Sequence, residues 1–154
     1  MYKIKIVSVG KMKKGYWCEA VAHYEKMLRA TARIEAIHVK DCSHLQGWER
    51  KTQEAALLGQ KIAARDRVLA LHEKGVLYSS HEFASMLRGV LENPTGQCCF
   101  VIGGALGLGQ DLLESAHGLV SLGPMTMPHE LAQVVLYEQI FRAMTIIGNR
   151  AYHY

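Results

Sequence analysis

The sequence predicts a single α/β domain over residues 1–154, with a mostly parallel sheet and helices on both of its faces. Short apolar or alternating runs take turns with amphipathic segments along the whole chain. No Pro- or Ser-rich linker and no internal repeat divides the 154 residues, a length that suits one core. Strands that alternate with helices favour parallel pairing, because each helix returns the chain to the start of the next strand.

Five segments have the composition of strands. The first alternates Lys3, Ile4, Lys5 and Ile6, the pattern of a half-buried strand, and the second alternates in the same way. The other three are short and continuously apolar, which is typical of strands covered on both faces. We therefore expect strands over residues 3–9, 33–39, 68–72, 98–102 and 118–122.

Helical signals fill the segments between these strands. Residues from Trp17 to Leu28 place apolar side chains along one helical face. Ser79 or Ser80 can cap a later helix that has Glu82 or Phe83 in its first turn and ends near Asn93-Pro94. The other expected helices cover residues 15–29, 49–65, 111–116 and 130–147.

The last of these helices is apolar on more than one side. A stripe with spacings of 4, 3 and 4 fits a helix packed on the sheet; it comprises Leu136, Ile140, Ala143 and Ile147. Further apolar residues lie elsewhere around the helix, namely Leu131, Val134, Val135, Phe141 and Ile146. A second apolar side favours burial against another copy of the chain in a two-fold dimer, with the chain's own tail as the alternative cover.

The charge is unevenly distributed along the chain. The net charge is +4, yet residues 1–67 carry 14 lysines and arginines against 7 acidic residues, whereas residues 68–154 carry 4 against 7. Much of the first excess comes from Lys11, Lys13, Lys14, Lys26, Arg29 and Arg33. The basic half favours a polyanionic partner such as nucleic acid, and an ordinary solvated surface is the alternative.

The cysteines and the apolar runs argue against a metal site, a membrane span and a signal peptide. Cys18, Cys42, Cys98 and Cys99 contain no C-x-x-C pair, and Cys42 with His44 lacks two further ligands, so we expect structural thiols and no metal site. Cys98 and Cys99 are neighbours on one strand and should face opposite sides of the sheet. No apolar run approaches the ~20 residues of a membrane span, and the N-terminus lacks the apolar core of a signal peptide. These features predict a cytoplasmic protein.

A glycine-rich loop, IGGALGLGQD, follows the fourth expected strand at residues 102–111. Its glycines give G-x-x-G-x-G rather than the dinucleotide-binding G-x-G-x-x-G, and no P-loop lysine follows. Three strand ends come in succession here: Leu71-His72, Ile102-Gly103-Gly104 and Leu122-Gly123-Pro124. Ligands of parallel sheets gather at such ends, so we expect a backbone-lined apolar pocket for an adenine-bearing cofactor, closed by the loop LGPMTMPHE.

Several motifs carry a resemblance to a known family. FVIGGALGL, SLGPMTMPHEL, YEQIFRAMTIIGN and the final AYH, together with VGKMKKGY, HYEKML and GVLYSSHEFA, resemble in order the motifs of the ribosomal RNA large-subunit methyltransferase H family. These are small SPOUT-class enzymes, and the resemblance spans essentially the whole chain. It implies a C-terminal trefoil knot, a homodimer and S-adenosylmethionine as the methyl donor. It also implies N3-methylation of a pseudouridine in 23S ribosomal RNA on assembled ribosomes, without a metal.

The resemblance also implies which residues form the site. The cofactor-binding residues would be Leu71, His72, Ile102, Gly103, Gly104, Leu122, Gly123, Pro124, Met125, Thr126, Met127 and Pro128. Because pseudouridine N3 must lose its proton, a general base or hydrogen-bonding group is expected. We expect His153 beside Tyr152 in this role, and Arg142 as a contact to phosphate or base. The alternatives are a terminal histidine without a role and an i,i+4 pair of Arg142 with Glu138.

This chain departs from many relatives at four places. Ala105-Leu106 stands where relatives often have Pro-Glu, and His72 stands at a usually acidic position. Gln133 replaces an arginine that we place at the dimer or RNA face, and the tail reads Ala151-Tyr152-His153-Tyr154 instead of Pro-Tyr-His with a following cation. Two alternatives therefore stay open: a SPOUT-like RNA methyltransferase with a different target, and a non-catalytic ribosome-binding module of the same fold.

Overall fold

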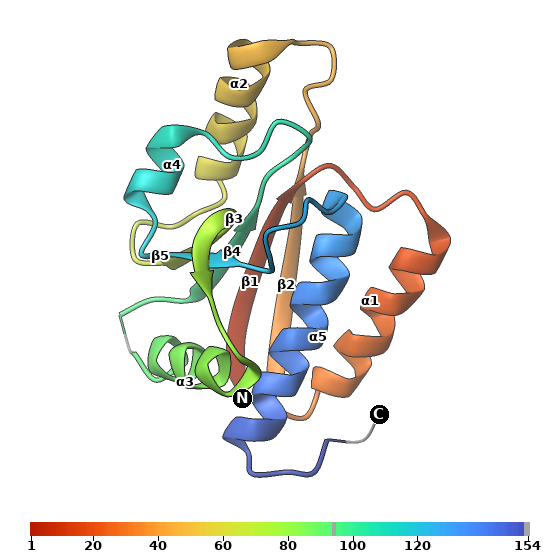
Figure 1. The fold of residues 1–154 in the computed structure, drawn as a ribbon, viewed down its shortest axis with the longest axis vertical. Helices are drawn as coiled ribbons and strands as arrows, with labels where there is room; N and C mark the ends of the chain where they lie inside the picture. Colours follow the sequence, from red (N-terminus) through yellow and green to blue (C-terminus); the bar gives the residue numbers. More distant parts are fainter. Residues whose placement is uncertain (94, 153–154) are drawn as a thin grey trace.

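The computed structural model describes residues 1–93 and 95–152 of the chain, and within them strands and helices alternate from end to end (Figure 1). The strands are β1 (Tyr2–Val9), β2 (Ala32–Val39), β3 (Arg67–Leu77), β4 (Cys98–Ile102) and β5 (Gly118–Ser121). The helices are α1 (Gly15–Leu28), α2 (Gly47–Gly59), α3 (Ser80–Leu91), α4 (Gln110–Ser115) and α5 (His129–Ile147).

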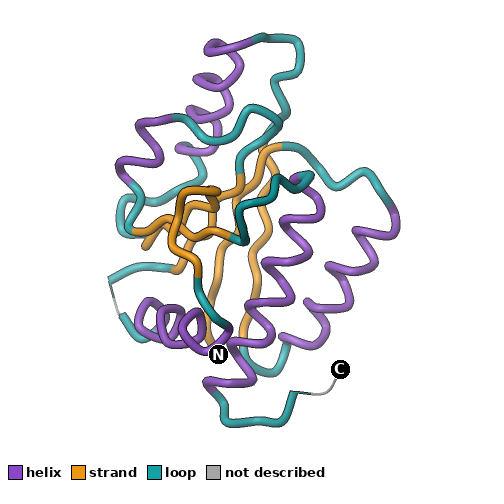
Figure 2. Tube along the Cα trace, viewed as in Figure 1, coloured by secondary structure: helices purple, strands orange, loops and turns teal. Residues whose placement is uncertain are grey.

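The strands form one sheet in the order β2-β1-β4-β3-β5, and every neighbouring pair is parallel. The predicted mostly parallel sheet is therefore confirmed. Because all strands run in the same direction, their carboxyl ends share one edge of the sheet. Figure 2 shows the loops that leave this edge, in teal, between the strands and the following helices. The trefoil knot stays a prediction.

Helices cover both faces of the sheet, as predicted. On one face, Ile4, Ile6 and Phe100 pack with residues of α3 and α5 such as Leu87 and Ile140. On the other face a second cluster joins the sheet to α2 and α4, and its members include Val7, Val101, Leu58 and Leu112. The expected split of the two neighbouring cysteines is confirmed, because Cys98 belongs to the first cluster and Cys99 to the second.

The cysteines should differ sharply in reactivity. Burial raises the pKa of Cys98 and that of Cys99 to about 12, and Cys42 is buried as well, whereas Cys18 is exposed. Only a thiolate reacts with disulfide reagents. We therefore expect such a reagent at pH 8 to label Cys18 in the native protein and the other three thiols only after unfolding, as counted by mass spectrometry. A Cys18→Ser variant is the control; rapid labelling of a second native thiol would contradict the packing.

The second helix is shorter than the sequence predicts, and the expected end at residue 65 is wrong. α2 ends at Gly59, and the following segment is held by contacts to another part of the chain. The ammonium of Lys5 on β1 donates to the carbonyl of Lys61 at 3.3 Å and to Asp66 at 2.7 Å, and Asp66 also accepts from the Ala63 amide. These contacts turn the chain toward β3 and stop the helix.

The third strand is longer than predicted. The polar residues that follow Leu71 interrupt the pairing with β5, which resumes at Val76 and Leu77 after a register shift. Val76 and Leu77 are 54% and 64% exposed, so no buried face marks them as strand in the sequence. Pairing with β5, rather than burial, is what keeps this part of the chain extended.

The remaining helices agree closely with expectation. Ser79 caps α3: its hydroxyl accepts from the Glu82 amide at 3.3 Å, and the Glu82 carboxylate accepts from the Ser79 amide at 2.8 Å. α3 ends at Leu91, close to the predicted end, and Pro94 lies outside the described residues. No helix among the described residues is long and apolar enough to cross a membrane.

The second apolar side of α5 is covered in part by the chain itself. α5 lies between α1 and α3 in Figure 1, and Phe141 contacts Tyr24 of α1 and Tyr152 of the tail, with ring centroids 6.3 Å and 5.5 Å away. Phe141 and Ile146 stay half-buried in the single copy. The tail therefore provides some of the cover that we assigned to a second copy, and the dimer stays a prediction.

Candidate functional site

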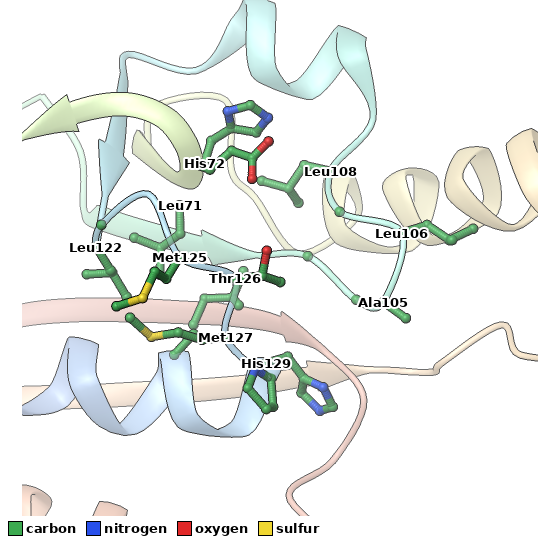
Figure 3. Close-up of a pocket in the computed structure, with 18 of the residues that line it drawn as sticks. Leu71, His72, Ala105, Leu106, Leu108, Leu122, Met125, Thr126, Met127 and His129 are labelled. Atoms are coloured by element: carbon green, nitrogen blue, oxygen red, sulfur yellow. The ribbon is translucent and has the colours of Figure 1, made fainter.

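A pocket of about 570 Å³ opens at the carboxyl edge of the sheet. Its walls come from the middle of β3, where the pairing with β5 is interrupted after Leu71, from the ends of β4 and β5, and from the loop that leads into α5 (Figure 3). Apolar side chains and glycine backbone dominate the wall, as in pockets that bind flat organic ligands. The lining residues include Leu71, Ile102, Leu108, Leu122, Met125, Thr126 and Met127.

The glycine-rich segment forms a tight turn on one wall of this pocket. The Gly107 amide donates to the Gly104 carbonyl at 3.0 Å, with Ala105 and Leu106 at the tip of the turn. A Cβ at Gly103 would lie 2.7 Å from the carbonyl carbon of Gly107. Two stretches of main chain therefore touch at Gly103, and only glycine leaves room for that contact.

The predicted cofactor residues converge on this pocket. All of them line it except Pro124, which belongs to the same loop but is absent from the wall. The three segments identified in the sequence thus come together, because β3 pairs in parallel with both β4 and β5. Leu71-His72 lies within β3, at the interruption of its pairing, and not at the strand end that we predicted. Ala105 and Leu106, which depart from the pattern of relatives, also line the pocket, and Leu106 is exposed at the turn (Figure 3).

Sequence reasoning missed two charged residues of the wall. Glu73 follows His72 directly and places a carboxylate at the pocket. Lys51 reaches the pocket from α2. Glu73 was detectable as the neighbour of a predicted ligand-binding residue, whereas no local pattern distinguishes Lys51 from the other lysines of the basic half.

Buried polar atoms surround the glycine turn. Glu54 of α2 accepts from the Cys42 amide at 3.2 Å and from Arg50 at 3.0 Å with one carboxylate oxygen. Its other oxygen has no hydrogen-bond partner among the described residues and lies 3.0 Å from where a Cβ of Gly104 would stand. The carboxylate of Glu54 thus packs against Gly104 in the glycine turn. Glu54 is 1% exposed, so this support is part of the protein interior.

Gln133 does not lie where the sequence placed it. We expected it at a dimer or RNA face, but it is 2% exposed, on the side of α5 that packs into the protein. Its carbonyl oxygen has no hydrogen-bond partner among the described residues. The interpretation of Gln133 as a cation lost from the surface is therefore wrong for the single copy, because the helix turns this side chain inward.

The expected catalytic residues lie away from the pocket. Arg142 follows His129, at the pocket, by 13 residues of α5, about 20 Å along the helix axis. It forms the i,i+4 ion pair with Glu138, at 2.8 Å, that was the alternative to a contact with RNA. Its guanidinium lies 3.9 Å from the centre of the Tyr152 ring. Tyr152 donates to Glu138 at 2.7 Å. His153 lies outside the described residues, so the structure brings Arg142 and Tyr152 together but not to the pocket.

The electrostatics of Tyr152 bear on its role. Burial, together with the hydrogen bond to Glu138 and its charge, raises the pKa of Tyr152 to about 12. The hydroxyl therefore stays protonated at neutral pH and acts as a hydrogen-bond donor. In this arrangement Tyr152 is unsuited to remove a proton.

Comparison with known sequences gives matches over the full chain. A family model described as "Predicted SPOUT methyltransferase" matches residues 2–153. A protein named ribosomal RNA large subunit methyltransferase H from Nitratidesulfovibrio vulgaris is 42% identical over 155 residues, which cover 100% of both chains. Proteins of the same name from Solidesulfovibrio magneticus and Streptococcus uberis are 39% and 36% identical, with coverage of 98% or more of each chain.

Solved structures agree on the fold. A probable methyltransferase from Bordetella pertussis superposes with a TM-score of 0.57 at 14% identity, covering 92% of this chain and 93% of the other. A probable methylase family protein from Haemophilus influenzae gives a TM-score of 0.53 at 12% identity, covering 98% and 70%. These likenesses concern the fold alone, whereas the sequence matches extend over the pocket loops and both ends of the chain. The chain belongs to the ribosomal RNA large subunit methyltransferase H family of SPOUT methyltransferases.

Proposed function

We propose that this protein uses S-adenosylmethionine to methylate N3 of a pseudouridine in 23S ribosomal RNA, on assembled ribosomes in the cytoplasm, and that it does so as a homodimer with a knotted C-terminal part. Family membership supports methyl transfer to ribosomal RNA. The observation that carries the proposal is the pocket formed where β4 and β5 end beside the interrupted middle of β3, with main chain exposed along the glycine turn.

The residues at the pocket fit this cofactor. Leu71, Leu122 and Met125 offer apolar surface for a flat adenine, and the glycine turn offers backbone amides and carbonyls for its polar edge. Lys51 is suited to a carboxylate, and Glu73 to ribose hydroxyls or an ammonium group. When bound, S-adenosylmethionine supplies an activated methyl group on its sulfonium. The pocket's task is to hold that group in line with the acceptor nitrogen.

The acceptor side of the reaction needs a group that takes up the N3 proton. Tyr152 is protonated and paired with Glu138, so we assign it hydrogen bonding rather than proton removal. His153 is our proposed base, and Arg142 our proposed contact to phosphate. Arg142 lies about 20 Å along the axis of α5 from the pocket-lining His129 of its own copy.

That separation supports an active site shared between two copies. We propose that the tail of one copy completes the pocket of the other. In heterodimers of a Gly103→Ala subunit with a His153→Ala subunit, one pocket is intact and faces an intact tail. At a donor concentration that the wild-type pocket binds and the Gly103→Ala pocket does not, we expect such heterodimers to recover up to about half of the wild-type rate per dimer, while either homodimer shows almost no activity. Inactive heterodimers would show that each tail serves its own pocket.

Two measurements test the main proposal. Calorimetry with S-adenosylmethionine asks whether the pocket binds the donor, and its failure would favour a non-catalytic ribosome-binding module. Incubation with a labelled methyl donor and ribosomes that lack the modification, followed by mapping of the labelled nucleotide, asks for the target. Label at another nucleotide would favour a SPOUT-like enzyme with a different target. No label in ribosomes or free ribosomal RNA would refute methyl transfer.

A further inference from the structure

The connection between β1 and α1 is fastened to the start of α5. The carboxylate of Glu130, in the first turn of α5, accepts hydrogen bonds from the backbone amides of Lys13 at 3.0 Å and Lys14 at 3.2 Å. Figure 1 shows this connection passing beside the first turn of α5. Residues 10–14, hereafter the basic loop, are therefore held in place by a residue next to the pocket-lining His129.

The basic loop begins at the pocket wall. Gly10 has φ +80°, a left-handed conformation that favours glycine, and its amide donates to the Val39 carbonyl at 2.8 Å. A Cβ on Gly10 would lie 3.5 Å from Nε2 of His129, which lines the pocket. That nitrogen is buried and has no hydrogen-bond partner among the described residues. The turn at Gly10 thus starts the basic loop directly beside a residue of the pocket wall.

The charges of the basic loop stay available for a ligand. Lys11, Lys13 and Lys14 are all exposed, and no ion pair of their ammonium groups is found within the described part of the chain. The carboxylate of Glu130 accepts from the backbone amides of two of these lysines and forms no ion pair with their ammonium groups within the described part of the chain. The positive charge of Lys11 also contributes to the lowered pKa of His38, after the larger effect of burial. A carboxylate next to the pocket-lining His129 therefore orders a loop that carries three exposed cations.

We propose that the basic loop binds the phosphates of the RNA strand whose base enters the methyl-donor pocket, and that Glu130 is the positioning residue that holds this loop in its binding conformation. The proposal rests on the proposed function, since it takes ribosomal RNA as the substrate. Lysines bind phosphate as point charges, independently of base sequence. The loop therefore supplies affinity and register, and the pocket supplies the choice of base.

The first test removes the three charges. We expect a Lys11→Gln/Lys13→Gln/Lys14→Gln variant to bind unmodified ribosomes at least about tenfold more weakly at 0.1 M salt, and the slope of log affinity against log salt to become shallower by about 2 to 3. A matched control, Lys26→Gln/Arg29→Gln/Arg33→Gln, removes three charges of the same basic half that lie outside the basic loop and should change affinity less than twofold. Equal losses of affinity in the two variants would refute a specific role of the basic loop in RNA binding.

The second test separates positioning from simple charge. Glu130→Gln removes the negative charge but keeps an oxygen that can accept from the amides, so it should bind ribosomes as tightly as the wild type or more tightly. Glu130→Ala removes the same charge and the acceptor, and we expect binding about tenfold weaker. If Glu130 acted by charge alone, both variants would strengthen binding. Tighter binding by the alanine variant, with an unchanged melting temperature, would overturn the positioning role.

Cofactor measurements keep this inference distinct from the proposed function. Ribosome binding is measured without the methyl donor, so it can be read even for a protein that transfers no methyl group. Calorimetry with S-adenosylmethionine should give the wild-type affinity for both lysine variants. A loss of donor affinity in the basic-loop variant alone would show that these lysines serve the donor's carboxylate instead of RNA, and the proposal would fail.

Discussion

Replacing Gly103 by alanine is expected to weaken the binding of S-adenosylmethionine by about 100-fold, close to 2.7 kcal/mol. The added Cβ would stand 2.7 Å from the carbonyl carbon and 3.0 Å from the carbonyl oxygen of Gly107. Both neighbours are main chain and cannot rotate away, so the turn from Gly104 to Gly107 must shift as a unit. The backbone groups offered to the donor move with it. Calorimetry with the purified variant measures the loss.

A glycine elsewhere provides the control. Gly89 lies within α3, and a Cβ there would meet nothing within 4 Å. Gly89→Ala should leave donor affinity unchanged and raise the free energy of unfolding by about 0.5–1 kcal/mol, because alanine is the better helix former. Wild-type donor affinity in the Gly103→Ala variant would mean that the turn does not contact the donor.

Replacing Lys5 by methionine is expected to lower the free energy of unfolding by about 3–5 kcal/mol. Lys5 and Asp66 form an ion pair at 2.7 Å, and their side chains are only 10% and 5% exposed. Methionine fills a similar volume but leaves the Asp66 carboxylate buried without its counter-charge. Urea unfolding at pH 7, followed by circular dichroism, measures the change.

Lys5 is fully protonated at the pH of this unfolding experiment. Burial lowers the pKa of Lys5, but the hydrogen bond and the charge of Asp66 outweigh it, so the pKa lies above its ordinary value of 10.5. A group whose pKa is raised on folding contributes its full stabilisation below the unfolded-state pKa. The contribution of Lys5 is therefore complete at pH 7 and is lost only as the pH rises through the folded-state pKa.

Two further variants show whether the buried charge is the cause. Lys5→Met with Asp66→Asn removes both charges and keeps an acceptor for the Ala63 amide, so it should recover a large part of the stability. Arg88→Gln breaks an ion pair whose side chains are 59% and 51% exposed, and it should change the free energy of unfolding far less than Lys5→Met does. A Lys5→Met variant no less stable than Arg88→Gln would contradict the importance of the buried pair.

The alternation of elements and the position of the glycine turn were predictable because both depend on residues close together in sequence. The sequence narrowed the cap of α3 to Ser79 or Ser80, and the hydrogen bonds between Ser79 and Glu82 in the structure decide for Ser79. The end of α2 was not predictable in this way. The contact that stops it joins Lys5 to Asp66, which are 61 residues apart, and no periodicity within α2 reveals that contact.

The residues of the site also fall into those that local sequence patterns predict and those that they do not. Residues of the three strand ends follow apolar strands directly, so local patterns identified them, and parallel pairing brought them together. Lys51 reaches the pocket from α2, which is distant in sequence from the other lining residues. The hydrogen bonds from the basic loop to Glu130 also join distant segments, since Glu130 and Lys13 are 117 residues apart. Sequence reasoning identified the lysines of the basic loop as an excess of charge and missed the residue that orders them.

By itself, the sequence determined the α/β class, the order of the elements, the burial of Cys98 and Cys99 on opposite faces of the sheet, and the family. Each of these depends on short local patterns or on the order of several motifs along the chain. Only the tertiary structure decided where α2 ends, that β3 continues to Leu77, that Gln133 is buried, and that Arg142 and Tyr152 lie far from the pocket of their own copy. The reason is physical. Local periodicity specifies which side of an element is apolar, whereas burial, ion pairs and strand pairing between distant segments specify how far each element extends and what it faces.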